Sequence, residues 1–74
     1  MARLPDVSSV ALIKALKRLG WAVRAVEGSH YHMQKPGRKP ITIPYHGSRS
    51  VKKGLLNHIL KIAGVSREEL ADNL

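Results

Sequence analysis

Three short runs with strand-like alternation lie between residues 21 and 45, and only brief turns separate them. The runs cover residues 21–26, 30–35 and 41–45, joined at Gly28-Ser29 and at residues 36–40. Strands with such short connections pair antiparallel, because a parallel pair needs a crossover of a dozen or more residues. We therefore expect a three-stranded antiparallel meander.

Alternation along these runs divides their side chains between two faces of the sheet. His30 and His32 are expected on the face opposite the core, and Pro44, which lacks an N–H, favours a strand end or an edge. The residues expected on the core face are Trp21, Val23, Ala25, Tyr31, Met33, Ile41 and Ile43. Alternation also groups Tyr45 with Ile41 and Ile43, and the choice between a core and a base-stacking role for Tyr45 stays open.

Helical patterns flank the strands. Residues 8–19 carry Leu12, Leu16 and Leu19 at helical spacing, and Gly20 follows as a C-terminal stop. Three residues are candidate N-caps, and the sequence does not choose among Asp6, Ser8 and Ser9.

A second helix is predicted over residues 51–63. Its apolar side chains form two neighbouring stripes, Leu55, Ile59 and Ile62 beside Leu56, Leu60 and Ala63, and Gly64 ends it. Ser66 and Glu69 have the spacing of a capping box and open a short helix through Leu70. The fold class is therefore α+β, with two helices on one face of the sheet, in one domain spanning residues 1–74.

Basic residues dominate the charge. Lys and Arg number 13 against five Asp and Glu, a net charge of +8, which favours a polyphosphate partner. The chain has no cysteine, which excludes disulfides and thiolate zinc sites and fits a reducing compartment. No apolar run approaches the ~20 residues of a membrane span, and residues 1–5 lack a signal-peptide apolar region, so we expect a cytoplasmic protein and no membrane partner.

Two groups of basic residues are candidate RNA contacts. One lies at the second turn of the sheet, and the other precedes or opens the second helix, where the helix N-terminus adds partial positive charge. The first group is Lys35, Arg38 and Lys39, and the second is Arg49, Lys52 and Lys53.

The histidines suggest what such a protein does to RNA. RNA carries its own nucleophile, the 2′-hydroxyl, so cleavage without a metal needs an acid and a base, roles that histidine fills near neutral pH. His30 follows a Gly28-Ser29 turn that gives a sugar-phosphate access to the backbone. His32 and His46 are candidate helpers together with Gly28 and Ser29. A metal bound by His30, His32 and His46 stays an alternative.

Several motifs in order resemble the HicA toxin family. They are Gly28-Ser29-His30, Ile43-Pro44-Tyr45-His46, Lys53-Gly54-x-Leu56 and Ile59-Leu60-Lys61-x-Ala63-Gly64-Val65-Ser66. The resemblance implies a fold like a double-stranded-RNA-binding domain and a toxin of a type II toxin–antitoxin system. Such a toxin is an endoribonuclease that cleaves mRNA without a metal or other cofactor and arrests translation and growth.

The resemblance also implies a catalytic role for His30 and inhibition by a HicB-like antitoxin. We expect the free toxin to be monomeric and to form a hetero-oligomer with that antitoxin. The family pattern often has threonine and arginine where this chain has Leu55 and Asn57, so Lys53, Lys61 or Arg49 must supply the phosphate contact.

Two other functions fit the residues. A non-catalytic RNA-binding module of the same fold would bind RNA in a salt-sensitive manner and leave it intact. A protein-interaction module would use the basic surface for an acidic partner and would have no RNA affinity at low salt.

Overall fold

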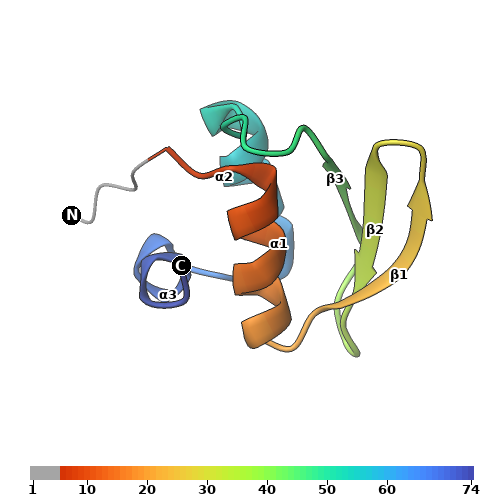
Figure 1. Ribbon diagram of the computed structural model, residues 1–74. Helices are drawn as coiled ribbons and strands as arrows, with labels where there is room; N and C mark the ends of the chain where they lie inside the picture. Colours follow the sequence, from red (N-terminus) through yellow and green to blue (C-terminus); the bar gives the residue numbers. More distant parts are fainter. Residues whose placement is uncertain (1–5) are drawn as a thin grey trace.

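A computed structural model describes residues 6–74 (Figure 1), so the prediction that residues 1–5 carry no signal region lies outside the described part. The order of elements confirms the α+β prediction. Helix α1 is followed by three strands, then by α2 and the short α3. Their bounds are α1 Ser9–Arg18, β1 Ala22–Glu27, β2 His30–Gln34, β3 Ile41–Pro44, α2 Lys53–Ala63 and α3 Arg67–Asp72.

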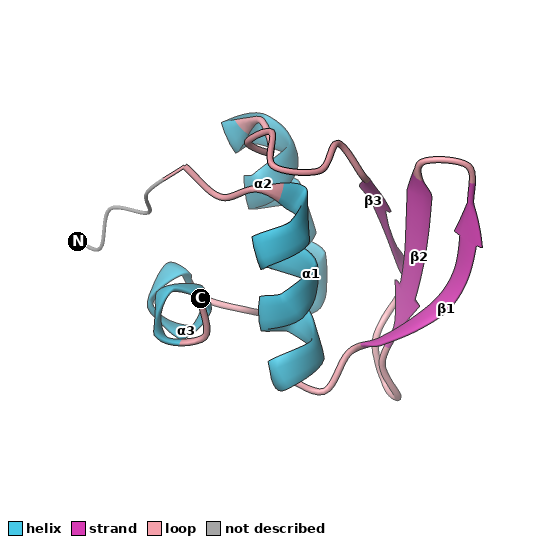
Figure 2. Ribbon diagram, viewed as in Figure 1, coloured by secondary structure: helices cyan, strands magenta, loops and turns pink. Residues whose placement is uncertain are grey.

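The strands form one antiparallel sheet in the order β1-β2-β3. Helices α1 and α2 cover one face, and α3 lies on the far side of α1 from the sheet (Figure 2). We call the uncovered side the open face. Cross-strand pairs place three rows on it, which are Glu27–His30–Pro44, Ala25–His32–Thr42 and Ala22–Gln34. His30 and His32 therefore share the open face, as their alternation predicts.

A β-bulge in β1 overturns one prediction. The register runs from Val23 opposite Met33 to Ala25 opposite His32, so Arg24 and Ala25 together oppose one residue of β2. An extra residue reverses the alternation beyond it. Ala25 is consequently exposed on the open face, and the prediction that it joins Trp21 and Val23 on the core face is wrong.

The core lies between the sheet and the helices. Trp21 is 2% exposed, and both predicted stripes of α2 contribute to the core or pack against it. Tyr31 and Tyr45 are half-buried and stack with ring centroids 4.9 Å apart, so Tyr45 belongs to the core face. The buried apolar residues are Val7, Leu12, Ile13, Ala15, Leu16, Trp21, Met33, Ile41, Ile43, Leu56, Ile59, Leu60, Ala63 and Leu70.

Local signals place most helix ends correctly. Ser8 is the N-cap of α1 and accepts the Ala11 N–H, which settles the choice among three candidates. Gly64 ends α2 in the left-handed region, and the Ser66–Glu69 capping box opens α3.

Other ends differ from the predictions by one or two residues, for tertiary reasons. The Trp21 N–H donates to Leu16 O at the end of α1, so β1 starts only at Ala22. Val51 donates to Val7 O and Ser50 bridges to Ser8, so this segment is extended and α2 begins at Lys53. No described helix is long and apolar enough to cross a membrane.

The two long helices begin at the same end of the sheet, where β2 starts and β3 finishes (Figure 1). We call this the histidine end, because His30 and the His46 loop lie there. The opposite end, which we call the turn end, holds residues 35–40 and the last turns of α1 and α2.

Candidate functional site

His30 is the first residue of β2 and is exposed on the open face. Gly28 in the preceding turn has φ +59°, a left-handed conformation that glycine adopts without strain. The Tyr45 N–H donates to Ser29 O, so the β2–β3 pairing continues past the strand ends and holds the backbone next to His30. Within residues 6–74 the His30 imidazole has no hydrogen-bond or ion-pair partner. Its ring nitrogens are therefore available to a ligand.

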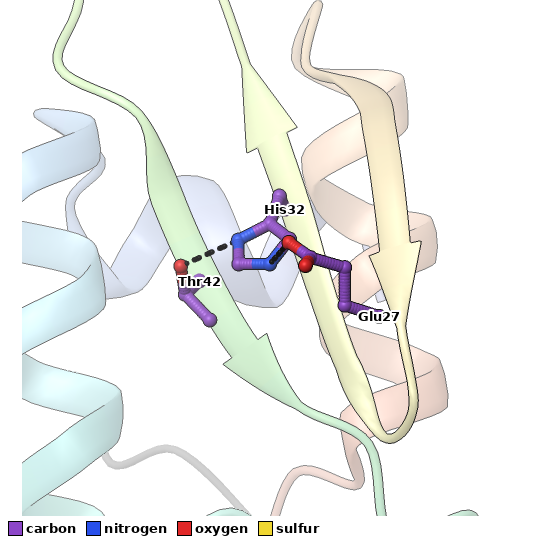
Figure 3. A network of polar contacts seen from close by, with 3 residues as sticks. All are labelled: Glu27, His32 and Thr42. Atoms are coloured by element: carbon purple, nitrogen blue, oxygen red, sulfur yellow. Dashed lines mark hydrogen bonds and ion pairs between the residues drawn. The ribbon is translucent and has the colours of Figure 1, made fainter.

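His32 lies in a different environment on the same face (Figure 3). Its Nδ1 lies 2.9 Å from Thr42 Oγ1 on β3, and its Nε2 lies 2.9 Å from Glu27 Oε1 on β1. A neutral ring satisfies both contacts, because Nε2–H can donate to the carboxylate while Nδ1 accepts from the hydroxyl. With both nitrogens engaged, His32 links the three strands rather than offering a free base.

A cavity of about 320 Å³ opens at the histidine end. Pro44, the residue paired with His30, is part of its wall, and His46 and Arg49 are also part of it. The complete lining is Ser9, Pro44, His46, Arg49, Ser50, Val51, Lys52 and Leu55. The structure thus brings His30 and His46 to the same end of the molecule, separated by Pro44.

Ser9 holds the His46 loop in place. Its side chain accepts the His46 N–H at 3.0 Å and donates to Gly47 O at 3.1 Å, and the residue is 1% exposed. The sequence suggested Ser9 only as a candidate N-cap. No local pattern identifies its role in the site, because its partners lie 37 and 38 residues away.

Basic residues surround this cavity. Arg49 and Lys52 line it, and Lys53 starts α2 beside it. Lys52 is the N-cap of α2 and forms no side-chain cap, and the backbone ladder begins with Leu56 N–H to Lys52 O. The free N–H groups of the first turn add partial positive charge, which suits a phosphate.

The other predicted basic group lies at the turn end, remote from His30. Lys35 Nζ donates to Leu19 O at 2.9 Å, and the Arg38 guanidinium packs over Gly64. These two cations therefore sit at the carboxyl ends of α1 and α2, where positive charge offsets the helix dipole. Lys39 is exposed in the same turn. The structure does not bring the two basic groups together.

Residues 6–74 contain no group of three His, Cys, Asp or Glu side chains placed to hold a metal ion. His30, His32 and His46 are therefore not grouped as the alternative metal site would require. His58 is exposed on α2, and Asn57 accepts a hydrogen bond from Arg67 at 3.1 Å.

Comparison with known proteins adds a family to this geometry. The family model described as HicA toxin of bacterial toxin–antitoxin matches residues 11–65, from within α1 to just beyond α2. A search of curated proteins gave no match. The matched region holds the whole sheet, His30 and the His46 loop, and it makes up most of the 74-residue chain. The chain belongs to the HicA toxin family, and it is thus a toxin of a toxin–antitoxin system.

Proposed function

We propose that this toxin is a metal-independent endoribonuclease that cleaves mRNA, with His30 as a catalytic residue. The observation that carries the proposal is the free imidazole of His30, exposed on the open face of a HicA-family fold. Of the two histidines on that face, His32 has both ring nitrogens engaged, so His30 is the one with nitrogens to offer.

The reaction we propose uses the 2′-hydroxyl of the RNA as its nucleophile. One imidazole takes the 2′-hydroxyl proton while the 2′-oxygen attacks phosphorus, and the bond from phosphorus to the 5′-oxygen breaks. A second group protonates the departing 5′-oxygen, leaving a 2′,3′-cyclic phosphate and a 5′-hydroxyl. His30 fills one role and His46 the other, and each contributes typically 10²–10⁴-fold.

Positive charge at the histidine end supports the same reaction. Arg49 and Lys52 line the cavity beside His46, Lys53 starts α2 next to it, and the first turn of α2 adds free N–H donors, which together supply positive charge for a phosphate. Charge that develops on the phosphate oxygens is stabilised by such fixed donors. The shallow, open site fits a polymeric substrate, because no enclosed cavity is needed to hold an RNA chain.

We also propose that a HicB-like antitoxin binds and blocks this toxin. The free toxin is then a monomer, and the inactive complex is a hetero-oligomer. Support comes from the toxin–antitoxin family and from the excess positive charge, which an acidic partner surface would complement.

The test is incubation of purified protein with a defined RNA, alongside His30→Ala and His58→Ala. His58 is a matched control, because it is also an exposed histidine but lies on α2, outside the proposed site. We expect His30→Ala to stop cleavage and growth arrest, and His58→Ala to retain both. A fully active, folded His30→Ala variant would refute the catalytic assignment.

Product termini and chelation separate the remaining possibilities. Cleavage that continues in EDTA and leaves a 2′,3′-cyclic phosphate supports the proposed route. A 3′-hydroxyl with a 5′-phosphate points to activated water instead. RNA that binds and stays intact indicates a non-catalytic RNA-binding module, and no RNA affinity at low salt indicates a purely protein-binding role.

A further inference from the structure

A second cavity, of about 370 Å³, lies at the turn end of the sheet. Its wall holds three cationic side chains, Arg24, Lys35 and Arg38, and no carboxylate. The complete lining is Gly20, Ala22, Arg24, Gln34, Lys35, Pro36, Arg38 and Pro40. Ala22 and Gln34 pair on the open face, so the cavity borders the same face as His30.

The bulge brings Arg24 to this cavity. Because Arg24 and Ala25 both oppose His32, the strand carries one side chain more on this side than regular alternation allows. The Lys35 ammonium donates to Leu19 O at the end of α1, and the Arg38 guanidinium lies over Gly64 at the end of α2. Arg24 instead has no hydrogen-bond or ion-pair partner in the described part of the chain. Its guanidinium is free to bind a ligand in the cavity.

The open face between this cavity and His30 favours a polyanion. His30, His32 and Gln34 follow one another along the face of β2, and the four residue steps from His30 to Gln34 span about 13 Å. From residue 7 to residue 66 the only acidic residue is Glu27, and its carboxylate is paired with His32. An RNA strand lying along β2 therefore meets one carboxylate from the sheet, that of Glu27, whose Oε1 contacts His32.

We propose that the Arg24 cavity is a distal phosphate subsite for the RNA strand whose scissile phosphate lies at His30. The subsite rests on the proposed function, and it extends the substrate from a single linkage to a segment that carries at least two phosphates. Arg24 is then a substrate-binding residue. A guanidinium presents a planar fork of donors that matches phosphate oxygens.

Binding of a single-stranded RNA across a KCl series tests the subsite without relying on cleavage. The protein carries His30→Ala, and Arg24→Gln is compared with Arg67→Gln, which removes the same charge from α3, away from the open face. We expect Arg24→Gln to make the slope of log K against log salt shallower by about 0.7, the value for one lost phosphate contact on a single strand. Arg67→Gln should keep the slope, and Arg24→Lys should restore most of it. Equal slopes for Arg24→Gln and Arg67→Gln would overturn the subsite.

Cleavage provides a second reading. A dinucleoside monophosphate carries one phosphate and cannot occupy both sites. The ratio of kcat/KM for a long RNA to kcat/KM for this dinucleotide should fall in Arg24→Gln and stay unchanged in Arg67→Gln. An unchanged ratio in Arg24→Gln contradicts the subsite even while His30 chemistry stands. A wild-type protein that cuts neither substrate refutes the proposed function, and the binding slope then decides the subsite alone.

Discussion

Glu27 lies opposite His30 across the β1–β2 pair, but its carboxylate contacts His32 in the next row of the open face. The bulge makes this possible, because it moves Glu27 from the core face to the open face. The contact holds Glu27, the one acidic side chain of the sheet, to the imidazole of His32. The imidazole of His30 is left without a partner. The two adjacent histidines are thereby given different environments by one extra residue in β1.

A double-mutant cycle tests the Glu27–His32 contact. Glu27→Ala, His32→Ala and the double variant are unfolded in urea, and the coupling free energy is taken from the four free energies of unfolding. We expect about 0.2–1 kcal/mol, the range for exposed ion pairs and cross-strand pairs. The Glu27 side chain is 76% exposed, so solvent screening favours the low end. Zero coupling would show that the pair does not link the strands.

A glycine in the first turn of α2 and the glycine that caps its end should respond to alanine in opposite directions. Gly64 has φ +68°, where a non-glycine residue costs about 1–3 kcal/mol. The added Cβ would also come within 2.5–2.6 Å of the Arg38 guanidinium, whose flexible end can move away. Gly54→Ala meets nothing within 4 Å in the first turn of the same helix, so it should stabilise by roughly 0.5–1 kcal/mol.

Thermal or urea unfolding of both alanine variants checks this pair. Because backbone strain dominates at Gly64, adding Arg38→Ala should recover little of the lost stability. Full recovery by Arg38→Ala would instead identify the side-chain contact as the cause.

Most of the fold was predictable because its signals are local. Apolar periodicity located both long helices, and the Ser66–Glu69 spacing located the start of α3. Gly64 at the end of α2 needed only its own backbone conformation. The three strands and their antiparallel order followed from short connections. The exposure of His30 followed from alternation along β2, which the bulge in β1 does not change.

What the sequence did not predict depends on pairing between distant segments. The bulge at Arg24 exists only relative to the β2 register, and nothing in residues 21–26 marks it. The start of α2 at Lys53 depends on Val51 donating to Val7 O. The separation of Lys35 and Arg38 from His30 depends on which end of the sheet each turn occupies.

Ser9→Ala should damage both stability and the histidine end. The change removes the buried hydroxyl that pairs with the His46 N–H and Gly47 O, and because both hydrogen bonds are part-buried, we expect a loss near the low end of about 1–3 kcal/mol. Ser8→Ala is the matched control, because losing that N-cap costs typically ~1 kcal/mol without touching the His46 loop.

RNA cleavage, measured where both serine variants remain fully folded, separates the two effects. We expect Ser9→Ala to lose more activity than Ser8→Ala, since it frees the loop that carries His46 and Arg49. Equal residual activity in the two variants would contradict a role for Ser9 in positioning that loop.

Lys53 and Lys61 offer a comparison within one helix. Lys53 opens α2 at the histidine end, and Lys61 lies in the last turn, about 12 Å further along the axis. Lys53→Gln should weaken RNA binding and make the salt slope shallower by about 0.7, the value for one phosphate contact on a single strand. Lys61→Gln removes the same charge and should leave the slope unchanged. If Lys61→Gln produces the larger change, the RNA follows the opposite end of α2, and the first-turn N–H groups are not where the phosphate binds.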